Sequence, residues 1–213
     1  MTVTIKDIEM IFTTASTSFS PHGLDKGTMA MLSVADIENA DGKILDLGCG
    51  YGAVGIYAAK IAGAENVIMS DIDAESIKLA SQNARTNEVP GITVIASNGF
   101  ENITEDAFSL ILSNPPYHAD FSVPKHFIEN GFRHLKIGGK MLMVTKRRDW
   151  YKNKFIAIFG GVTIHEIDGY FVFCAEKRRP HRAGKNKASK QTIEKQTTNK
   201  VSKQTNHKSS TAK

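Results

Sequence analysis

The sequence has few cysteines, no long apolar run and no leader-like start. Its two cysteines, Cys49 and Cys174, lie far apart among 213 residues, which excludes a disulfide framework and gives no metal-ligand spacing. No apolar run approaches the roughly 20 residues that a membrane-spanning helix needs. The first residues lack the basic start and apolar stretch of a signal peptide. We therefore expect a soluble cytoplasmic protein with reduced thiols, no membrane contact and no bound metal.

Basic residues are outnumbered by acidic ones in most of the chain and are concentrated in its last 37 residues. The net charge is +5, but Lys177 to Lys213 contain 12 of the 27 lysines and arginines and one of the 22 acidic residues. The first 176 residues therefore hold 15 basic and 21 acidic residues, a net charge of −6. Beyond residue 177, only Ile193 and Val201 are aliphatic side chains larger than alanine, too few to offset the entropy of ordering. We predict a folded domain over residues 1–177 and a disordered basic tail over residues 178–213.

Two interpretations of this tail stay open. It is either a solubilising extension or an arm that attracts RNA by neutralising phosphates and releasing counterions. Because the rest of the chain is mildly acidic, RNA binding inferred from overall charge would rest on the tail alone.

Short β-rich runs alternate with helical patterns from residue 43 to residue 175. Such alternation predicts a parallel sheet with helices on both faces. Asp168-Gly169 is a strong hairpin signal, so the last strand should run antiparallel. Within residues 1–42, the patterns over residues 3–12 and 25–35 predict a small β element and a helix. The expected strands are residues 43–47, 66–70, 92–95, 108–112, 141–145, 162–167 and 170–175, and the expected helices are 53–61, 74–86, 124–135 and 150–159.

A glycine-rich turn follows the first of the sheet strands. Closely spaced glycines at the carboxyl end of such a strand let a ligand approach the backbone, and here they are Gly48, Gly50 and Gly52. Asp46 lies just before them, where it would repel a pyrophosphate, and the Lys-Ser/Thr of a phosphate loop is missing. The turn therefore favours a cationic ligand without phosphates.

An acidic residue follows the second sheet strand. A carboxylate at this position can accept hydrogen bonds from both hydroxyls of a ribose, and Asp71 is the first candidate. Asp73 lies two residues further on and could take the same role. The alternative for either residue is capping of the helix that starts at Ala74, which suits Asp73 well.

The sequence Ser113-Asn114-Pro115-Pro116-Tyr117 directly follows the fourth sheet strand. The two prolines fix the backbone and remove donors, which leaves carbonyl oxygens free to accept. The Asn114 amide oxygen and the Pro115 carbonyl can accept from one NH2 group and aim its lone pair at an electrophile. Tyr117 offers a flat face to a planar acceptor. We predict that Asn114, Pro115, Pro116 and Tyr117 form the catalytic loop.

Together these motifs resemble the class I S-adenosylmethionine-dependent methyltransferases. Within that class, Phe19–Thr28 and Ser97–Phe100 make the chain similar to the catalytic domain of the guanine-N2 methyltransferases of small-subunit (16S) ribosomal RNA, although these commonly have phenylalanine where this chain has Tyr117. The resemblance covers about residues 1–176. It implies an α/β, Rossmann-like sheet of seven strands, mostly parallel with a C-terminal antiparallel hairpin and helices on both faces.

The resemblance also assigns residues to the implied cofactor, S-adenosylmethionine. The segment Phe19–Thr28 resembles the part of the family that contacts the methionine end of the cofactor, and Asn98 would lie beside the adenine. The expected cofactor contacts are Asp25, Gly27, Thr28, Asp46, Gly48, Gly50, Gly52, Asp71, Asn98 and Asn114.

The expected reaction is methyl transfer from S-adenosylmethionine to an exocyclic amino nitrogen of a nucleobase, with guanine N2 in 16S ribosomal RNA as the first choice. Its rate would come from positioning and electrostatics rather than from a strong base. A protein glutamine amide and adenine N6 in RNA or DNA remain alternative acceptors, and an RNA-binding assembly factor is the non-enzymatic alternative. The expected partner is ribosomal RNA or a ribosomal subunit, and we expect a monomer.

One further segment combines charge with aromatic side chains. Lys146-Arg147-Arg148 precedes Trp150-Tyr151-Lys152 near the carboxyl end of a predicted strand. This segment either contacts RNA phosphates or begins a solvated helix. His118 directly follows the catalytic loop and is a candidate substrate contact.

Overall fold

The computed structural model of this chain describes residues 1–14, 23–115 and 120–180. All of them belong to one unit, Met1–Pro180. The predicted tail lies outside the described residues apart from residues 178–180. Pro116, Tyr117 and His118 also lie outside them, as does most of the segment before Asp25 that the family resemblance singled out.

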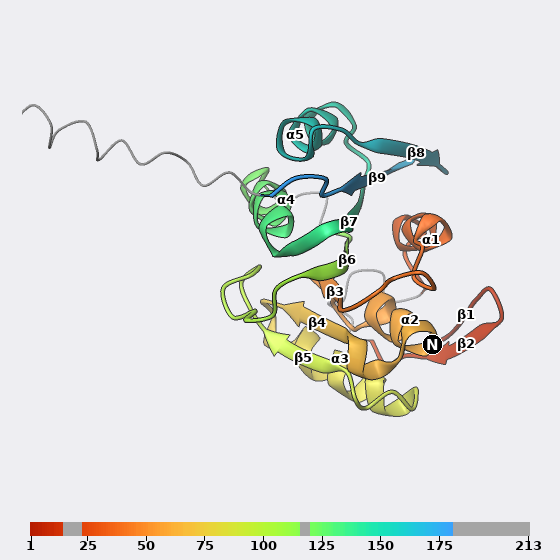
Figure 1. Ribbon diagram of the computed structural model, residues 1–213. Coiled ribbons are helices and arrows are strands. Elements are labelled where there is room, and N and C mark those ends of the chain that lie inside the picture. Colours follow the sequence, from red (N-terminus) through yellow and green to blue (C-terminus); the bar gives the residue numbers. More distant parts are fainter. Residues whose placement is uncertain (15–22, 116–119, 181–213) are drawn as a thin grey trace, which may run out of the picture. The chain divides into compact units, whose positions relative to one another are not determined.

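A seven-stranded sheet forms the centre of this unit (Figure 1). Its strand order is β5-β4-β3-β6-β7-β9-β8. All neighbours from β5 to β7 are parallel, whereas β9 runs antiparallel to β7 and β8. This arrangement confirms the predicted Rossmann-like sheet with an antiparallel C-terminal hairpin. The strands are β3 (Ile44–Leu47), β4 (Val67–Asp71), β5 (Thr93–Ala96), β6 (Phe108–Ser113), β7 (Leu135–Thr145), β8 (Thr163–Ile167) and β9 (Tyr170–Glu176).

Helices cover both faces of the sheet. One core contains apolar residues of the first three helices, and the other contains those of the last two. Strand β3 shows the alternation: Ile44 belongs to the first core, whereas Leu45 and Leu47 belong to the second. A strand buried on both faces has to be apolar along most of its length, which is why these strands appear as continuous apolar runs. The helices are α1 (Lys26–Val34), α2 (Ala53–Ala62), α3 (Ala74–Thr86), α4 (Ser122–His134) and α5 (Asp149–Phe159), with a short 3-10 helix η1 (Ala64–Asn66).

The predicted C-terminal hairpin is present, and its turn has the expected geometry. Asp168 and Gly169 have φ angles of 49° and 77°, the positive values that a tight two-residue hairpin turn requires. The prediction for β7 was wrong at its start, because this strand begins at Leu135 rather than at Met141. It continues through Gly138 and Gly139, where a Cβ on Gly139 would lie 2.6 Å from the Phe108 carbonyl oxygen. Glycine therefore allows a close approach to β6, and Gly138-Gly139 forms an irregularity within the strand rather than a turn before it.

A small hairpin, β1 (Thr2–Ile5) and β2 (Ile8–Ile11), precedes the sheet. Its turn lies at Lys6 and Asp7. Two buried asparagines, Asn83 of α3 and its C-cap Asn87, hold the end of this hairpin and the residues after it: the Asn87 side chain bonds both backbone groups of Ile11, and the Asn83 side chain bonds both of Thr13. These four bonds satisfy the outer edge of the segment, as a neighbouring strand would.

Candidate active site

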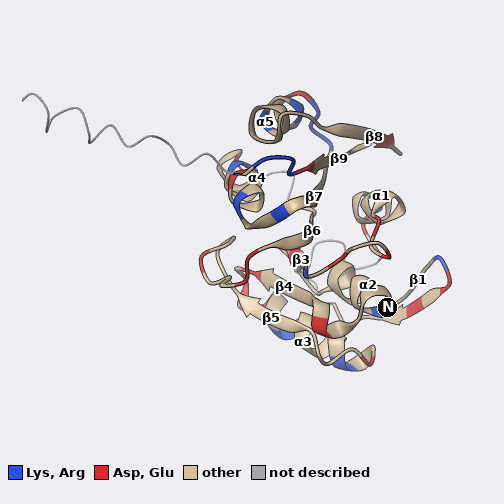
Figure 2. Cartoon of the chain, in the orientation of Figure 1, with Lys and Arg blue, Asp and Glu red and all other residues tan. Residues whose placement is uncertain are grey.

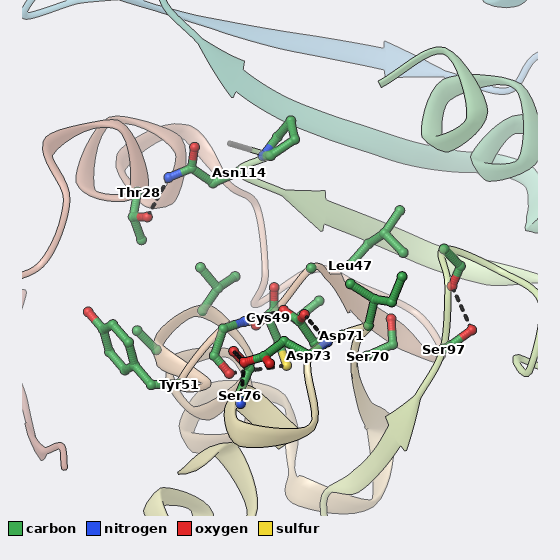
Figure 3. A pocket seen from close by; sticks show the side chains of 18 of the residues that line it. Thr28, Leu47, Cys49, Tyr51, Ser70, Asp71, Asp73, Ser76, Ser97 and Asn114 are labelled. Atoms are coloured by element: carbon green, nitrogen blue, oxygen red, sulfur yellow. Dashed lines mark hydrogen bonds between the residues drawn. The ribbon is translucent and has the colours of Figure 1, made fainter. Parts of the chain in front are cut away.

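A cavity of about 390 Å³ opens at the carboxyl ends of β3, β4, β5 and β6. Its size lies within the range of small-molecule sites, and its position is where doubly wound sheets bind ligands. Figure 3 shows the side chains that line it. The walls come from the start of α1, the glycine turn after β3, the loops after β4, β5 and β6, and the first turns of α4.

The glycine turn is held against the end of β4. Backbone N–H groups of Gly48 and Cys49 donate to the Ser70 carbonyl at 2.8 and 2.9 Å, and the Gly50 N–H donates to Asp71 Oδ2 at 2.8 Å. Of the three glycines predicted to contact the cofactor, Gly48 and Gly50 line the cavity and Gly52 does not. Gly52 has a φ of 93°, and a Cβ there would lie 3.3 Å from Ala80. Its role in this structure is close packing of α2 against α3.

The two aspartates at the carboxyl end of β4, Asp71 within the strand and Asp73 after it, have different environments. Asp71 lines the cavity, and its Oδ1 and Oδ2 each accept one backbone N–H, from Asp73 and Gly50. Each carboxylate oxygen can accept a further bond. Asp73 instead caps α3, because its Oδ2 accepts from the backbone N–H and the hydroxyl of Ser76. Those hydrogen bonds hold the pKa of Asp73 below its ordinary value. Both aspartates line the cavity, but Asp73 is engaged in the helix cap, whereas each Asp71 oxygen accepts a single backbone N–H.

Asp46 is a buried carboxylate beneath the glycine turn. Its side chain is only 2% exposed, and its Oδ2 accepts the Gly55 backbone N–H at 2.8 Å. Burial raises the pKa of Asp46 to about 7, against the lowering effect of the Gly55 bond and with a further contribution from Asp71. Burial also raises the pKa of the neighbouring Cys49 thiol, so this cysteine stays protonated and unreactive. The cavity floor thus holds a carboxyl group that changes its charge near neutral pH.

Asn114 is oriented by two residues of the α1 N-terminus. Its Nδ2 donates to Asp25 Oδ2 at 2.8 Å and to Thr28 Oγ1 at 2.9 Å, and Figure 3 shows the bond to Thr28. A carboxylate can only accept, so this side-chain amide has its NH2 group toward Asp25 and its oxygen on the other side. Asp25 also caps α1 by accepting the Thr28 backbone N–H at 3.0 Å. Two residues predicted as cofactor contacts therefore fix the rotamer and the flip of the predicted catalytic asparagine.

Two buried polar atoms have no hydrogen-bond partner among the described residues, and both belong to residues that line this cavity. They are Asn114 Oδ1 and Ser70 Oγ. Leaving such an atom unpaired costs about 1–3 kcal/mol, so both atoms are available to a hydrogen-bonding group that enters the cavity. Pro115, next to Asn114, is buried and lines the cavity.

The remaining predicted residues differ in their placement. Asn98 lies exposed at the rim of the cavity, and its Nδ2 donates to Glu101 Oε1 at 3.0 Å. Gly27 is buried in the first turn of α1 and does not line the cavity. The predicted roles of Pro116 and Tyr117 fall on residues outside the described part of the chain.

Several cavity residues were not predicted from the sequence. Ile72 is 70% exposed and lies between the two aspartates at the rim, and Val123 and Phe127 contribute from α4. An isoleucine left exposed directly after a buried strand was the available signal for the first of these. Tyr51 also lines the cavity, and burial together with the Asp25 charge raises its pKa to about 12. The cavity therefore combines apolar side chains with five acidic ones, Asp25, Asp46, Asp71, Asp73 and Glu75.

No cluster of three or more histidine, cysteine or acidic side chains among residues 1–14, 23–115 and 120–180 could hold a metal ion. No helix in the same ranges has the length and apolar character to cross a membrane.

The sequence matches the model of one protein family. The methyltransferase small domain covers residues 9–174. The chain belongs to the methyltransferase small domain family. The predicted methyltransferase family and fold are thereby confirmed.

Several bacterial proteins are similar to this methyltransferase small domain in sequence or in structure. Ribosomal RNA small subunit methyltransferase C of Serratia proteamaculans is 33% identical over 174 residues, which are 79% of this chain and 49% of that protein. Uncharacterized protein YbxB of Bacillus subtilis is 27% identical over 178 residues, 81% of this chain and 89% of that protein. Among solved structures, the Thermus thermophilus 16S rRNA N2 G1207 methyltransferase RsmC, in complex with AdoMet and guanosine, matches with a TM-score of 0.75 at 24% identity.

The two comparisons with methyltransferase C proteins concern only part of those proteins. The Thermus match covers 84% of this chain and 50% of that chain. This methyltransferase small domain thus spans about half the length of these relatives. The likeness to the Thermus structure shows a shared fold.

Proposed function

We propose that this chain transfers the methyl group of S-adenosylmethionine to the exocyclic N2 amine of a guanine in 16S ribosomal RNA. The observation that carries the proposal is the buried Oδ1 of Asn114, which has no hydrogen-bond partner among the described residues and lines the cavity beside Pro115 at the end of β6. An acceptor oxygen held in this position can accept a hydrogen bond from the NH2 group of an exocyclic amine.

The residues of the cavity fit S-adenosylmethionine. The free lone pairs of Asp71 suit the two ribose hydroxyls, and the exposed side chain of Ile72 offers an apolar surface to adenine. Asp25, Asp46 and Asp71 all line the same cavity, and their carboxyl groups suit a ligand with a positively charged sulfur. When bound, S-adenosylmethionine supplies an electrophilic methyl group.

The chain's own contribution to the reaction is to hold and orient the amine. Asn114 Oδ1 and the Pro115 carbonyl accept its two hydrogen atoms, which turns the nitrogen lone pair out of conjugation with the base. Asp25 and Thr28 keep the amide from flipping, since a flipped Asn114 would direct NH2 toward the acceptor amine. Positioning of this kind lowers the barrier without a general base. Tyr117 is the predicted stacking residue, and the target nucleotide has to be unstacked from its neighbours.

The relatives support guanine in ribosomal RNA as the acceptor. The Serratia relative is named for the small-subunit RNA, and the Thermus structure is described as a guanine-N2 methyltransferase in complex with guanosine. The partner in this proposal is 16S ribosomal RNA or the small subunit, and the activity is that of a cytoplasmic monomer.

The test uses purified protein and tritiated S-adenosylmethionine. Small subunits and free 16S ribosomal RNA from a strain that lacks the gene are the acceptors, and labelled RNA is digested to nucleosides. We expect the label in N2-methylguanosine. Label in N6-methyladenosine would move the acceptor to adenine, and label that survives RNase but not protease would move it to a protein amide. The protein carrying Asn114→Ala serves as the matched blank.

Asp46 predicts a pH dependence of cofactor binding. Its carboxyl group titrates at about 3.9 when unfolded and at about 7 in the folded protein. The stability that this group contributes is therefore fully present below about pH 4 and is lost as the pH rises through 7. A bound cation favours the carboxylate, so the affinity for S-adenosylmethionine should increase as the pH rises through 7.

S-adenosylhomocysteine, which lacks the methyl group and the sulfonium charge, is the matched control ligand for this dependence. Isothermal titration calorimetry on either side of pH 7 should show the affinity ratio of the two ligands increasing with pH. The exchange Asp46→Asn keeps an acceptor for the Gly55 N–H and should remove the increase. A ratio that does not change with pH in the unmodified protein would contradict a role for this carboxylate.

A further inference from the structure

The acceptor has to approach Asn114 from a defined side. Asn114 follows β6, and the cavity extends from there toward β3, β4 and β5. The neighbour on the other side is β7, whose residue Met143 pairs with Ser113. The segment after β7 therefore lies at the same edge of the sheet as Asn114, on the side away from Asp71. With the cofactor over β3 and β4, a polynucleotide that delivers a base to Asn114 passes over this segment.

Three side chains form a stack at this position, which we call the Arg147 stack. The Arg147 guanidinium lies over the Phe121 ring at 4.9 Å, and the Phe121 ring stacks on Trp150 with centroids 4.5 Å apart and planes 24° apart. Phe121 directly precedes α4, whose residue Val123 lines the cavity. Phe121 of the stack therefore lies only two positions before Val123 of the cavity wall.

The base of the stack is anchored in the core. Trp150 contacts Tyr151 edge to face at 5.1 Å, and Tyr151 stacks on Phe173 of β9 at 5.7 Å. Tyr151 and Phe173 are buried, whereas Phe121 and Trp150 are half-buried and Arg147 is exposed. The aromatic layers are therefore fixed before any ligand arrives, and the exposed layer is a planar cation.

The charge around the stack is mostly positive. Lys146, Arg147 and Arg148 are consecutive and exposed, and Figure 2 colours this stretch of chain before α5 blue. Arg148 is 3.8 Å from Asp149, and Lys146 lies over the Tyr170 ring. Arg147 forms no ion pair with any carboxylate in the described part of the chain, although Asp120 and Asp149 are exposed nearby in sequence. A guanidinium that is stacked but not ion-paired can contact a phosphate with its edge and a base with its face.

We propose that the Arg147 stack binds single-stranded RNA next to the target nucleotide, with a flanking base on the Arg147 guanidinium plane and a phosphate at its edge. This proposal deepens the proposed function and rests on it for the identity of the partner. Bases stack on arginine planes and aromatic rings in single-stranded RNA complexes, and a preformed stack avoids the entropy of ordering side chains on binding.

The test measures RNA binding without methyl transfer. Fluorescence anisotropy follows a short fluorescein-labelled, guanine-containing single-stranded RNA bound to the full chain. We expect Arg147→Met to weaken binding at least about fivefold, as the loss of one stacked base predicts, and Arg147→Lys to weaken it nearly as much because lysine has no plane. Lys60→Met is the matched control: it removes one exposed charge at the C-terminal end of α2 and should leave binding within about twofold, since it removes no stacking contact.

Each outcome decides the proposal. Equal losses for Arg147→Met and Lys60→Met would reduce the contact to general electrostatics and overturn it. If Arg147→Lys bound the RNA as tightly as the unmodified protein, Arg147 would contact a phosphate but no stacked base. That result would also overturn the proposal. The proposed function is judged separately, by the methylated nucleoside. If N2-methylguanosine forms while Arg147→Met binds RNA normally, the function stands and the Arg147 stack fails.

Discussion

Replacing Asn114 by alanine is expected to lower kcat by at least about a hundredfold, the loss typical of removing one preorganised group that acts on the reacting atoms. The physical reason is that Asn114 Oδ1 is buried and free of other partners among the described residues, so its interaction is reserved for the acceptor amine. Tritium transfer to RNA at saturating substrate gives kcat. Calorimetry with S-adenosylmethionine shows whether the cofactor still binds.

Thr28 provides the matched pair for this prediction. Its hydroxyl accepts from Asn114 Nδ2, and Thr28 also lines the cavity, where it is a predicted cofactor contact. Thr28→Val should lower kcat about five- to tenfold, as loss of one hydrogen bond predicts, whereas Thr28→Ser should keep most of it. The Kd for S-adenosylmethionine, measured beside kcat, separates the two roles: a lower kcat at an unchanged Kd assigns the hydroxyl to the amide, and a raised Kd assigns it to the cofactor. If Asn114→Ala kept near-full turnover, the assignment of this residue to the amine would be wrong.

The second large effect is expected at Asp71. Its carboxylate has a free lone pair on each oxygen beside the cavity, and charge-assisted hydrogen bonds contribute about 1.5–3 kcal/mol each. Asp71→Ala should therefore raise the Kd for S-adenosylmethionine by about a hundredfold or more, measured by calorimetry, with two such bonds lost.

A paired exchange at the two aspartates separates ligand binding from helix capping. Asp71→Asn replaces one acceptor oxygen by a donor and should raise the Kd substantially. Asp73→Asn keeps a good cap for α3, so its Kd should stay within about threefold of the original value because asparagine and aspartate cap almost equally well. The reverse order of effects would assign the ribose contact to Asp73. Thermal unfolding of both variants checks that α3 remains intact.

The sequence predicted the candidate site residues that lie next to a recognisable apolar strand. The glycine turn, the acidic residue after β4 and the asparagine after β6 each follow an apolar strand directly, and parallel strands bring such positions to one edge. The hairpin at Asp168-Gly169 was predictable for the same local reason, since its turn needs residues that tolerate positive φ. These features do not depend on contacts between distant parts of the chain.

Other features depend on contacts that no local pattern encodes. The bond between Asn114 and Asp25 joins residues 89 positions apart, so the orientation of the amide could not be foreseen. The start of β7 was missed because Gly138-Gly139 has the composition of a turn, whereas these glycines lie inside the strand, at the register shift between the pairs Phe108–Leu135 and Leu110–Lys140. Gly52 was assigned to the cofactor by its motif, but its proximity to Ala80 becomes visible only once α3 is packed.

The position of β9 has a consequence for folding during synthesis. This strand follows β8 in the chain but lies between β7 and β8 in the sheet. A nascent chain that has emerged only as far as β8 leaves one edge of β7 unpaired, along the apolar residues Met141–Val144. Open apolar edges tend to pair with other chains. The C-terminal half of the sheet can therefore close only after residues 170–176 have left the ribosome. Until then the unpaired edge of β7 is exposed, and a chaperone that binds it would prevent aggregation.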